Sequence, residues 1–332
     1  MGNITENDHI FWVFGETYLD FQNAYLRFEN VKYYPRIEIK MNKENIENEL
    51  QTFDLIIYHG VFDRYLIDFF SRHKAILRKL VLYFWGGDKE EPQKWEDRVR
   101  KKFVIRNAAA IVTIIPQDFQ DLKKKYHPKG KHFCAKYNID HAFGIADRIL
   151  KLPVKRENTI NIQVGNSATE TNNHLALFDI LGKYRSDRIK IYAPLSYGNM
   201  DYADRVIERG KEIFGDKFVP IQKMMSLEEY YLHLNKMDVG VFAMKRQQAL
   251  GNINTMMKFG CKIFLCRESL LWEYYAQNLE CTISDIKEIP QMTIKEFARF
   301  SEDEKIHNRK QIQLNNRTES TIESWRYIFN SI

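Results

Sequence analysis

Short apolar runs rich in β-branched and aromatic residues recur along the whole chain, and each is followed by a segment of helical periodicity. In the first half the runs are HIFWVFG, FDLIIYHG, KLVLYFWGG, AAIVTII and KHFCAKYN. The pattern then restarts with TINIQVGNS, IKIYAPLS, KFVPIQK, DVGVFAMK, CKIFLCR and LECTISD. Alternation of strand and helix is typical of parallel sheets covered by helices. The sequence therefore predicts two α/β domains, in agreement with its length of 332 residues.

The boundary between the two domains is expected in the polar, proline-containing segment 150–158. We place the first domain at residues 1–152 and the second at residues 158–305. In the remaining segment, 306–332, four apolar residues are spaced by three or four positions: Ile322, Trp325, Phe329 and Ile332. This spacing predicts an amphipathic helix that packs on one of the domains.

The net charge and the cysteine content limit the kinds of ligand and the cellular location that we expect for this protein. Lys and Arg outnumber Asp and Glu by 50 to 44, and this net charge of +6 suits an anionic small molecule or a phospholipid surface. The excess is too small to indicate nucleic acid, and no nucleic-acid-binding motif is present. The four cysteines lack a CxxC pair and lie in strand-like runs, so we expect reduced, buried thiols and a cytoplasmic location. Without a signal-peptide pattern or about 18 consecutive apolar residues, membrane contact is expected to be peripheral.

Ligands of open α/β sheets bind beyond the carboxyl ends of the strands, so the residues after each apolar run are candidates for a site. In the second half these residues are basic, polar and rich in amides: 165–167, 194–197, 222–223, 245–248 and 267–268. After DVGVFAM the loop leads through Gly251, which permits close approach, to a helix expected to start near Asn252 to Asn254. The N–H groups of such a start can bind a diphosphate, with Lys245 or Arg246 adding charge. In the alternative reading the amides only cap a surface helix.

Several familiar site patterns are missing from the sequence. Neither GxGxxG nor GxxxxGK[ST] occurs, which disfavours a dinucleotide enzyme and a P-loop NTPase. The stretch Gly165, Asn166, Ser167 is compatible with a phosphate contact and equally with an ordinary strand-to-helix turn. The metal-binding patterns HExxH, clustered Cys and His, and DxD are also missing from the sequence. We therefore expect that the protein uses no metal ion and no cofactor. Cations and helix termini would then stabilise a leaving diphosphate.

Strands of the first domain end at Gly15 and Glu16, at His59, and at the sequence Trp85, Gly86, Gly87, Asp88. His59 or Asp88 could act as a general base on a hydroxyl group. The alternatives are a structural histidine and an aspartate that closes a turn. Basic runs at 98–102 and 121–131 are either solvated faces or contacts with anionic lipid.

Six stretches stand out when these positions are taken together: YHGVF (58–62), FWGGD (84–88), VGNSATETNNH (164–174), APLSYGN (193–199), FAMKRQQALGNINTMMKFG (242–260) and CRESLLW (266–272). In order and spacing they resemble glycosyltransferase family 56, the bacterial TDP-N-acetylfucosamine:lipid II N-acetylfucosaminyltransferases of enterobacterial common antigen synthesis. The resemblance implies a GT-B architecture, in which two Rossmann-like lobes with parallel sheets face a cleft. The first domain would bind the acceptor and the second the nucleotide sugar, and the C-terminal helix would cross back to the first.

The expected function is metal-independent transfer of an N-acetylfucosamine-like deoxyhexose from a dTDP-sugar to a lipid-diphosphate-linked saccharide. The enzyme would lie on the inner face of the bacterial plasma membrane. Alternatives are a UDP-linked donor with a protein or capsule glycan acceptor, and a non-catalytic sugar-nucleotide-binding partner. We assign donor binding to Gly165, Asn166, Ser167, Tyr197, Lys245, Arg246, Gln247, Gln248, Gly251, Asn252, Asn254, Thr255 and Glu268. Acceptor binding is assigned to Gly15, Glu16, Trp85, Gly86 and Gly87, and the base is His59 or Asp88.

Overall fold

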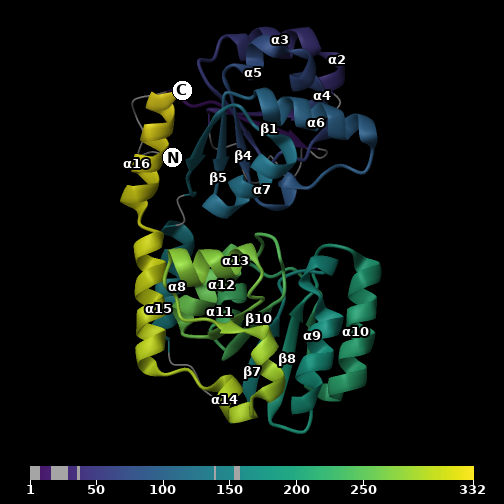
Figure 1. Cartoon of the computed structure of the whole chain (residues 1–332), viewed down its shortest axis with the longest axis vertical. Coiled ribbons are helices and arrows are strands. Elements are labelled where there is room, and N and C mark those ends of the chain that lie inside the picture. The colour runs from purple at the N-terminus through teal and green to yellow at the C-terminus, as the bar shows by residue number, and fades with distance from the viewer. Residues whose placement is uncertain (1–7, 16–28, 36–37, 138–139, 153–157) are drawn as a thin grey trace. The chain divides into compact units, whose positions relative to one another are not determined.

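The computed structural model describes the chain except for residues 1–7, 16–28, 36–37, 138–139 and 153–157. The chain divides into two compact units, Met1–Asn138 with Glu319–Ile332, and Ile139–Thr318 (Figure 1). Because the division falls at Asn138, helix α8 (Asp140–Leu150) belongs to the second unit. The C-terminal segment contributes to both units. Helix α15 (Glu302–Asn315) lies in the second and nearly all of α16 (Thr318–Ser331) in the first.

The first unit contains a parallel four-stranded sheet in the order β3-β4-β5-β6. Its strands are β3 (Ile56–His59), β4 (Leu80–Phe84), β5 (Ala110–Thr113) and β6 (Lys131–Cys134). The helices that connect or follow them are α4 (Arg64–Arg72), α5 (Lys74–Leu77), α6 (Trp95–Asn107) and α7 (Pro116–Tyr126). A separate parallel pair is formed by β1 (Phe11–Gly15) and β2 (Val31–Pro35), followed by α2 (Glu38–Met41) and α3 (Lys43–Gln51).

Both faces of the four-stranded sheet are covered, and β4 is buried along its whole length. Successive side chains of a strand point to opposite faces. Leu82 and Phe84 accordingly join the core formed with α4 and α6, whereas Val81 and Tyr83 join Ile328 of α16 on the other face. Trp325 of α16 stacks on Tyr83 at 5.7 Å between ring centroids. The amphipathic helix expected near the carboxyl end is therefore confirmed, although Ile332 is 42% exposed.

The second unit contains a parallel six-stranded sheet in the order β12-β11-β10-β7-β8-β9. The strands are β7 (Ile160–Val164), β8 (Ile189–Pro194), β9 (Phe218–Ile221), β10 (Val239–Phe242), β11 (Lys262–Leu265) and β12 (Ser284–Asp285). The main helices are α9 (His174–Leu181), α10 (Met200–Phe214), α11 (Leu227–Leu234), α12 (Leu250–Phe259), α13 (Leu270–Trp272) and α14 (Ile294–Ala298). β7 and β8 contribute Ile162, Val164 and Ile191 to the core. In both strands apolar residues alternate with polar ones, as in INIQV of β7 and the Ile-Lys-Ile start of β8, and the apolar positions enter the core.

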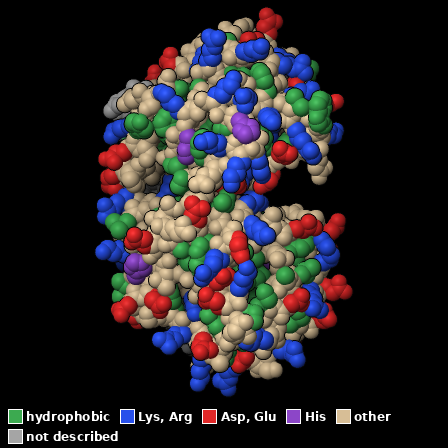
Figure 2. Space-filling view, viewed as in Figure 1, with side chains coloured by type: hydrophobic (Ala, Val, Ile, Leu, Met, Phe, Trp, Pro, Cys, Tyr) green, Lys and Arg blue, Asp and Glu red, His purple; other side chains and the backbone are tan. Residues whose placement is uncertain are grey.

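The predicted parallel α/β sheets are confirmed in both units. Strand β2 was not predicted: VKYYP contains Val and two Tyr, which are common in strands, but it is only five residues long and ends in proline. The prediction of four buried thiols is right for Cys261 and Cys281 but wrong for Cys134, which is exposed, and for Cys266, which is half-buried. None of the four cysteines forms a disulfide. Among the described helices, none combines the length and the apolarity that crossing a bilayer requires. Lys and Arg side chains gather on the visible face of the first unit, the upper part of Figure 2.

Candidate active site

The strand order of the second sheet reverses between β7 and β10. The chain forms β7, adds β8 and β9 on one side, and then crosses to the other side of β7 to form β10, β11 and β12. β7 and β10 are directly paired, with Val164 opposite Val241. Ligands of doubly wound sheets bind at the carboxyl ends of the strands where the order reverses. The predicted loops 165–167 and 245–248 follow these two strands, so the structure brings them to the switch point.

The loop after β7 is held in a fixed shape by a glycine and a buried amide. Gly165 has a φ of +68°, and a Cβ there would lie 2.6 Å from His174 Nε2 and 2.8 Å from Asn172 Oδ1. Asn172 is fully buried; its Oδ1 accepts a hydrogen bond from Asn166 N at 3.0 Å, and its Nδ2 donates to Ser167 O at 2.9 Å. Asn172 is not among the predicted site residues, since nothing in TETNN distinguishes a buried asparagine from a surface one.

Gln248 joins the loops after β7 and β10. Its Nε2 donates to Asn166 Oδ1 at 2.8 Å, and its Oε1 accepts from Thr171 Oγ1 at 2.8 Å. Asn166 Nδ2 donates in turn to Tyr197 Oη at 3.1 Å, which adds the loop after β8. Four predicted donor residues, Asn166, Ser167, Tyr197 and Gln248, are thus close together, and the Tyr197 side chain remains 47% exposed.

Helix α12 begins beside this network with an open first turn. It starts at Leu250 after Ala249, which has a φ of 61°, and no side chain caps it. Gly251 is exposed, and a Cβ there would meet no atom within 4 Å. The predicted start near Asn252 to Asn254 is therefore wrong. Asn254 is buried and accepts from Tyr275 Oη at 2.7 Å.

Side chains around this helix start differ in their exposure. Lys245 is exposed and Arg246 half-buried, and Arg246 Nη1 donates to Gln247 O at 3.3 Å. Gln247 is buried, and among the described residues its Oε1 has no hydrogen-bond partner. Thr255 is also buried, so its side chain is closed to a ligand, as that of Asn254 is. Of the helix start, the first-turn backbone, Gly251 and the half-buried Asn252 remain accessible.

Glu268 lies after β11 and belongs to a separate group of charges. It forms an ion pair with Lys287 and accepts from Cys266 Sγ at 3.1 Å. The hydrogen bond from Lys287 lowers the pKa of the Glu268 carboxyl. No described contact joins Glu268 to the Gln248 network, so its assignment to donor binding stays a prediction.

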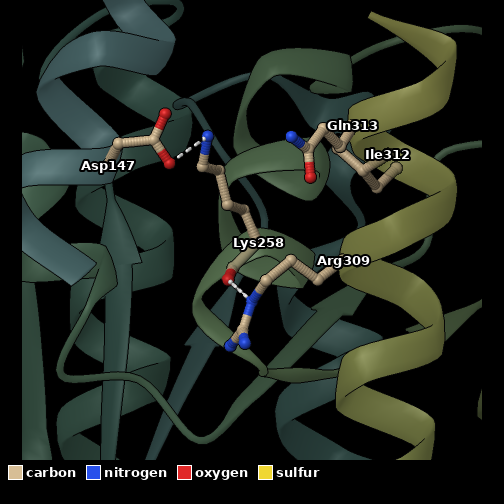
Figure 3. A pocket seen from close by; sticks show the side chains of 5 residues that line it. All are labelled: Asp147, Lys258, Arg309, Ile312 and Gln313. Carbon is tan, nitrogen blue, oxygen red and sulfur yellow. Dashed lines mark hydrogen bonds and ion pairs between the residues drawn. The ribbon is translucent and has the colours of Figure 1, made fainter. Parts of the chain in front are cut away.

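A small pocket lies elsewhere in the second unit, among α8, α12 and α15 (Figure 3). Lys258 Nζ pairs there with Asp147 Oδ1 at 2.8 Å, and Arg309 Nε donates to Lys258 O at 2.9 Å. Its volume of about 40 Å³ is enough for a few water molecules only. Ligand sites for small molecules are typically about ten times larger, so this pocket is not the candidate site.

In the first unit, His59 and Trp85 lie at the carboxyl ends of the paired strands β3 and β4. Trp85 is 49% exposed, and its ring meets that of Tyr137 edge-on at 5.5 Å. His59 has its ring centroid 5.0 Å from that of Tyr83 and 6.5 Å from that of Trp325. Although the His59 side chain keeps an exposed surface, burial among these rings lowers its pKa to about 4. His59 is therefore neutral near pH 7, the state that a general base needs.

Asp88 holds the loop that carries Trp85. Its Oδ1 accepts from Trp85 N and Gly86 N, each at 2.9 Å, and its Oδ2 accepts from Val61 N at 3.0 Å. The side chain is fully buried, and this burial raises its pKa. Both carboxylate oxygens already accept hydrogen bonds from backbone N–H groups, so this geometry disfavours the predicted role of Asp88 as a base. Gly86, with a φ of 105°, and Gly87 are parts of the same loop.

Of the other predicted acceptor residues, Gly15 ends β1 and Glu16 lies outside the described residues. Among the described residues, no group of three or more His, Cys, Asp or Glu side chains is placed to hold a metal ion.

Residues 8–317 match the family model of glycosyl transferase group 56, described as 4-alpha-L-fucosyltransferase. The match spans most of the chain, including both candidate regions. The chain belongs to glycosyltransferase family 56. This family 56 member is therefore a transferase enzyme that moves a sugar, and the resemblance drawn from the sequence is confirmed.

Solved structures support the fold of this family 56 transferase. HepE of Anabaena, in complex with UDP and glucose, is similar with a TM-score of 0.69 and 11% identity, over 97% of this chain and 92% of that one. A glycosyltransferase of Rickettsia africae is similar with a TM-score of 0.68 and 14% identity, over 97% of this chain and 89% of that one. The N-terminal domain of a Candida albicans trehalose-6-phosphate phosphatase is similar with a TM-score of 0.67 and 11% identity, over 97% of this chain and 89% of that one. The predicted GT-B fold class is thereby confirmed.

Proposed function

We propose that this transferase binds the diphosphate of a nucleotide sugar at the switch point of the second unit. The open first turn of α12 carries the proposal, because it combines unblocked N–H groups with the exposed Gly251. Lys245 and Arg246 precede it and supply positive charge. Helix N-termini favour anions through their N–H groups and their dipole. The Gln248 network fixes the neighbouring loop, so its amide and hydroxyl groups are positioned before the donor arrives.

For the reaction we propose transfer of an N-acetylfucosamine-like deoxyhexose from a dTDP-sugar to a saccharide on a lipid diphosphate. The acceptor oxygen forms the new bond to the anomeric carbon, and the nucleoside diphosphate leaves with the electron pair of the broken bond. The negative charge of that leaving group grows in the transition state, where the α12 N–H groups and the two cations stabilise it. His59 Nε2 takes the acceptor proton, and Trp85 offers an exposed ring on which a sugar can stack.

We further propose that the first unit contacts the inner membrane surface, where a lipid-linked acceptor is found. On α6, Trp95 is 73% and Val99 is 48% exposed, and they are spaced by one helical turn. Exposed cations lie beside them in the sequence of α6 and at the end of the next helix, α7: Lys94, Arg98, Lys102, Lys123 and Lys124. Cations near an anionic bilayer contribute about 1 kcal/mol each, and interfacial tryptophan adds apolar contact. Cosedimentation with phosphatidylglycerol vesicles, but not with phosphatidylcholine vesicles, is the expected result.

Titration with free dTDP and UDP tests the donor site. Arg246→Ala is expected to weaken binding about tenfold or more, because a charge-assisted hydrogen bond contributes about 1.5–3 kcal/mol. Lys190→Ala is the matched control, since Lys190 is an exposed cation near the amino end of β8. Equal affinities for Arg246→Ala and the parent would refute this placement. Tighter binding of UDP than dTDP would refute the proposed donor base, and transfer assays with a lipid-diphosphate saccharide test the acceptor.

A further inference from the structure

One buried carboxylate joins the loops that follow β3 and β4 in the first unit. Asp88 Oδ1 accepts from Trp85 N and Gly86 N of its own loop, each at 2.9 Å. Asp88 Oδ2 accepts from Val61 N, in the loop after β3, at 3.0 Å. The two oxygens of one side chain thus couple the two loops, since a shift of either loop would leave buried polar groups without partners.

The backbone around Asp88 is held from two helices as well. Lys101 Nζ, on α6, donates to Asp88 O at 2.5 Å and to Glu90 O at 2.8 Å. Tyr126 Oη, on α7, donates to Lys89 O at 2.9 Å. Both side chains are buried, so these hydrogen bonds are shielded from water. The loop after β4 therefore presents its exposed side chains from fixed positions.

Each of the two coupled loops carries a large aromatic side chain that is exposed. Phe62 is 63% and Trp85 is 49% exposed. The Phe62 ring passes close to the loop backbone, because a Cβ on Gly60 would lie 3.4 Å from Phe62 Cδ2. The Trp85 ring is supported edge-on by that of Tyr137. Both rings are thus supported on one side and open to a ligand on the other.

We infer that Phe62 and Trp85 together contact the saccharide of the acceptor, and that Asp88 is the positioning residue that sets both rings. The inference rests on the proposed function, in which this edge of the first sheet binds the acceptor. Sugar rings combine C–H faces, which pack on aromatic rings, with hydroxyl groups, which need polar neighbours. His59 ends β3 beside these loops and keeps an exposed surface that can meet such hydroxyl groups. A lipid chain would need a continuous apolar surface, which two single rings on glycine-rich loops do not provide.

The sugar contact is tested by isothermal titration of the full chain with two probes. N-acetylglucosamine 1-diphosphate carries a sugar and no lipid chain, and geranyl diphosphate carries a lipid chain and no sugar. Phe62→Ala and Trp85→Ala should each weaken binding of the sugar probe about eightfold, if a sugar covers about 50 Å² of ring at about 25 cal/mol per Å². Geranyl diphosphate should bind to them as to the parent. Tyr327→Ala is the matched control, since Tyr327 is a 67% exposed ring on α16.

The positioning role of Asp88 is tested with Asp88→Asn. The single oxygen of an asparagine has two lone pairs for the three N–H groups that Asp88 binds, so the loops should separate and the Kd of the sugar probe should rise. A merely structural role would lower the number of folded molecules, which changes the stoichiometry of the titration at constant Kd. Asp68→Asn is the control, since Asp68 pairs with Arg100 between α4 and α6 and has no described polar contact with either loop.

Unchanged affinity of Phe62→Ala for the sugar probe, or an equal loss for geranyl diphosphate, would overturn the sugar contact. A parent that does not bind the sugar probe would overturn it too. A parental Kd in Asp88→Asn would overturn the positioning role. If the Phe62 dependence is found but the parent transfers no sugar from dTDP- or UDP-sugars, the proposed function fails while the inferred contact stands.

Discussion

Replacing Gly251 by alanine should stabilise the protein and weaken donor binding at the same time. Gly251 is the second residue of α12 and has ordinary helical backbone angles. Its added Cβ would meet no atom within 4 Å, so the substitution creates no clash. Alanine in a helix is about 0.5–1 kcal/mol more stable than glycine, because glycine loses more backbone freedom on folding. The melting temperature is expected to rise by about 1–4 °C.

The same methyl group would stand where the proposed diphosphate approaches. Cα–Cβ bonds tilt toward the N-terminus of a helix, so the new group leans over the first-turn N–H groups of α12. Loss of one hydrogen bond to a charged group costs about 1.5–3 kcal/mol, which corresponds to a loss of affinity of about 13- to 160-fold. Isothermal titration with dTDP and UDP measures this loss, and thermal unfolding without ligand measures the stability.

Gly144→Ala provides the matched control. Gly144 is an exposed glycine of α8, and a Cβ there would likewise meet no atom within 4 Å. This variant should gain similar stability and bind nucleoside diphosphates as the parent does. If Gly251→Ala also bound them as tightly as the parent, the start of α12 would not be the diphosphate site, however stable the variant proved.

Three further predictions concern the rest of the molecule. Gln248→Glu should weaken dTDP or UDP binding more than Gln248→Ala in the same titration, because a carboxylate cannot donate to Asn166 Oδ1 and repels a diphosphate. Lys89→Met should cost about 3–5 kcal/mol in urea denaturation, with partial recovery in the double variant with Asp118→Asn, because Lys89 and Asp118 are a fully buried pair at 2.6 Å. Burial lowers the pKa of His174 to about 4, so the stability due to its neutral ring should fall as pH drops from 6.5 to 4, and His174→Gln should flatten this dependence.

Much of the fold followed from local pattern. Central strands such as β4 and β10 were predictable because parallel strands buried on both faces are nearly continuous apolar runs. The terminal helix was predictable from its apolar residues at spacings of three and four. Candidate loops could be located because they follow those runs directly. Strand order could not be predicted. An apolar run indicates that a strand is buried, but it does not indicate which strand pairs with it. The adjacency of β7 and β10, which makes loops 165–167 and 245–248 neighbours, therefore required the structure.

Roles of single polar residues were harder to predict than the location of the site. Asp88 after two glycines has the sequence of an exposed strand-end carboxylate, yet it folds back on the N–H groups of its own loop. Asn254 has the residue type of a helix cap, yet it faces the core and bonds to Tyr275. In both cases local sequence gives the chemistry of the side chain, while the direction in which it points depends on distant packing.

The correction at Asn254 changes where the binding energy of the proposed donor site would come from. With Asn254 and Thr255 buried, donor recognition at α12 must rely on the backbone of its first turn and on Lys245 and Arg246. A backbone site fixes the position of a diphosphate but does not distinguish one nucleotide from another. Discrimination would then fall to the exposed side chain of Tyr197, whose hydroxyl the Asn166 amide holds in place. Substitutions at Tyr197 should accordingly alter the preference among nucleotides, whereas those at Gly251 should weaken all nucleoside diphosphates alike.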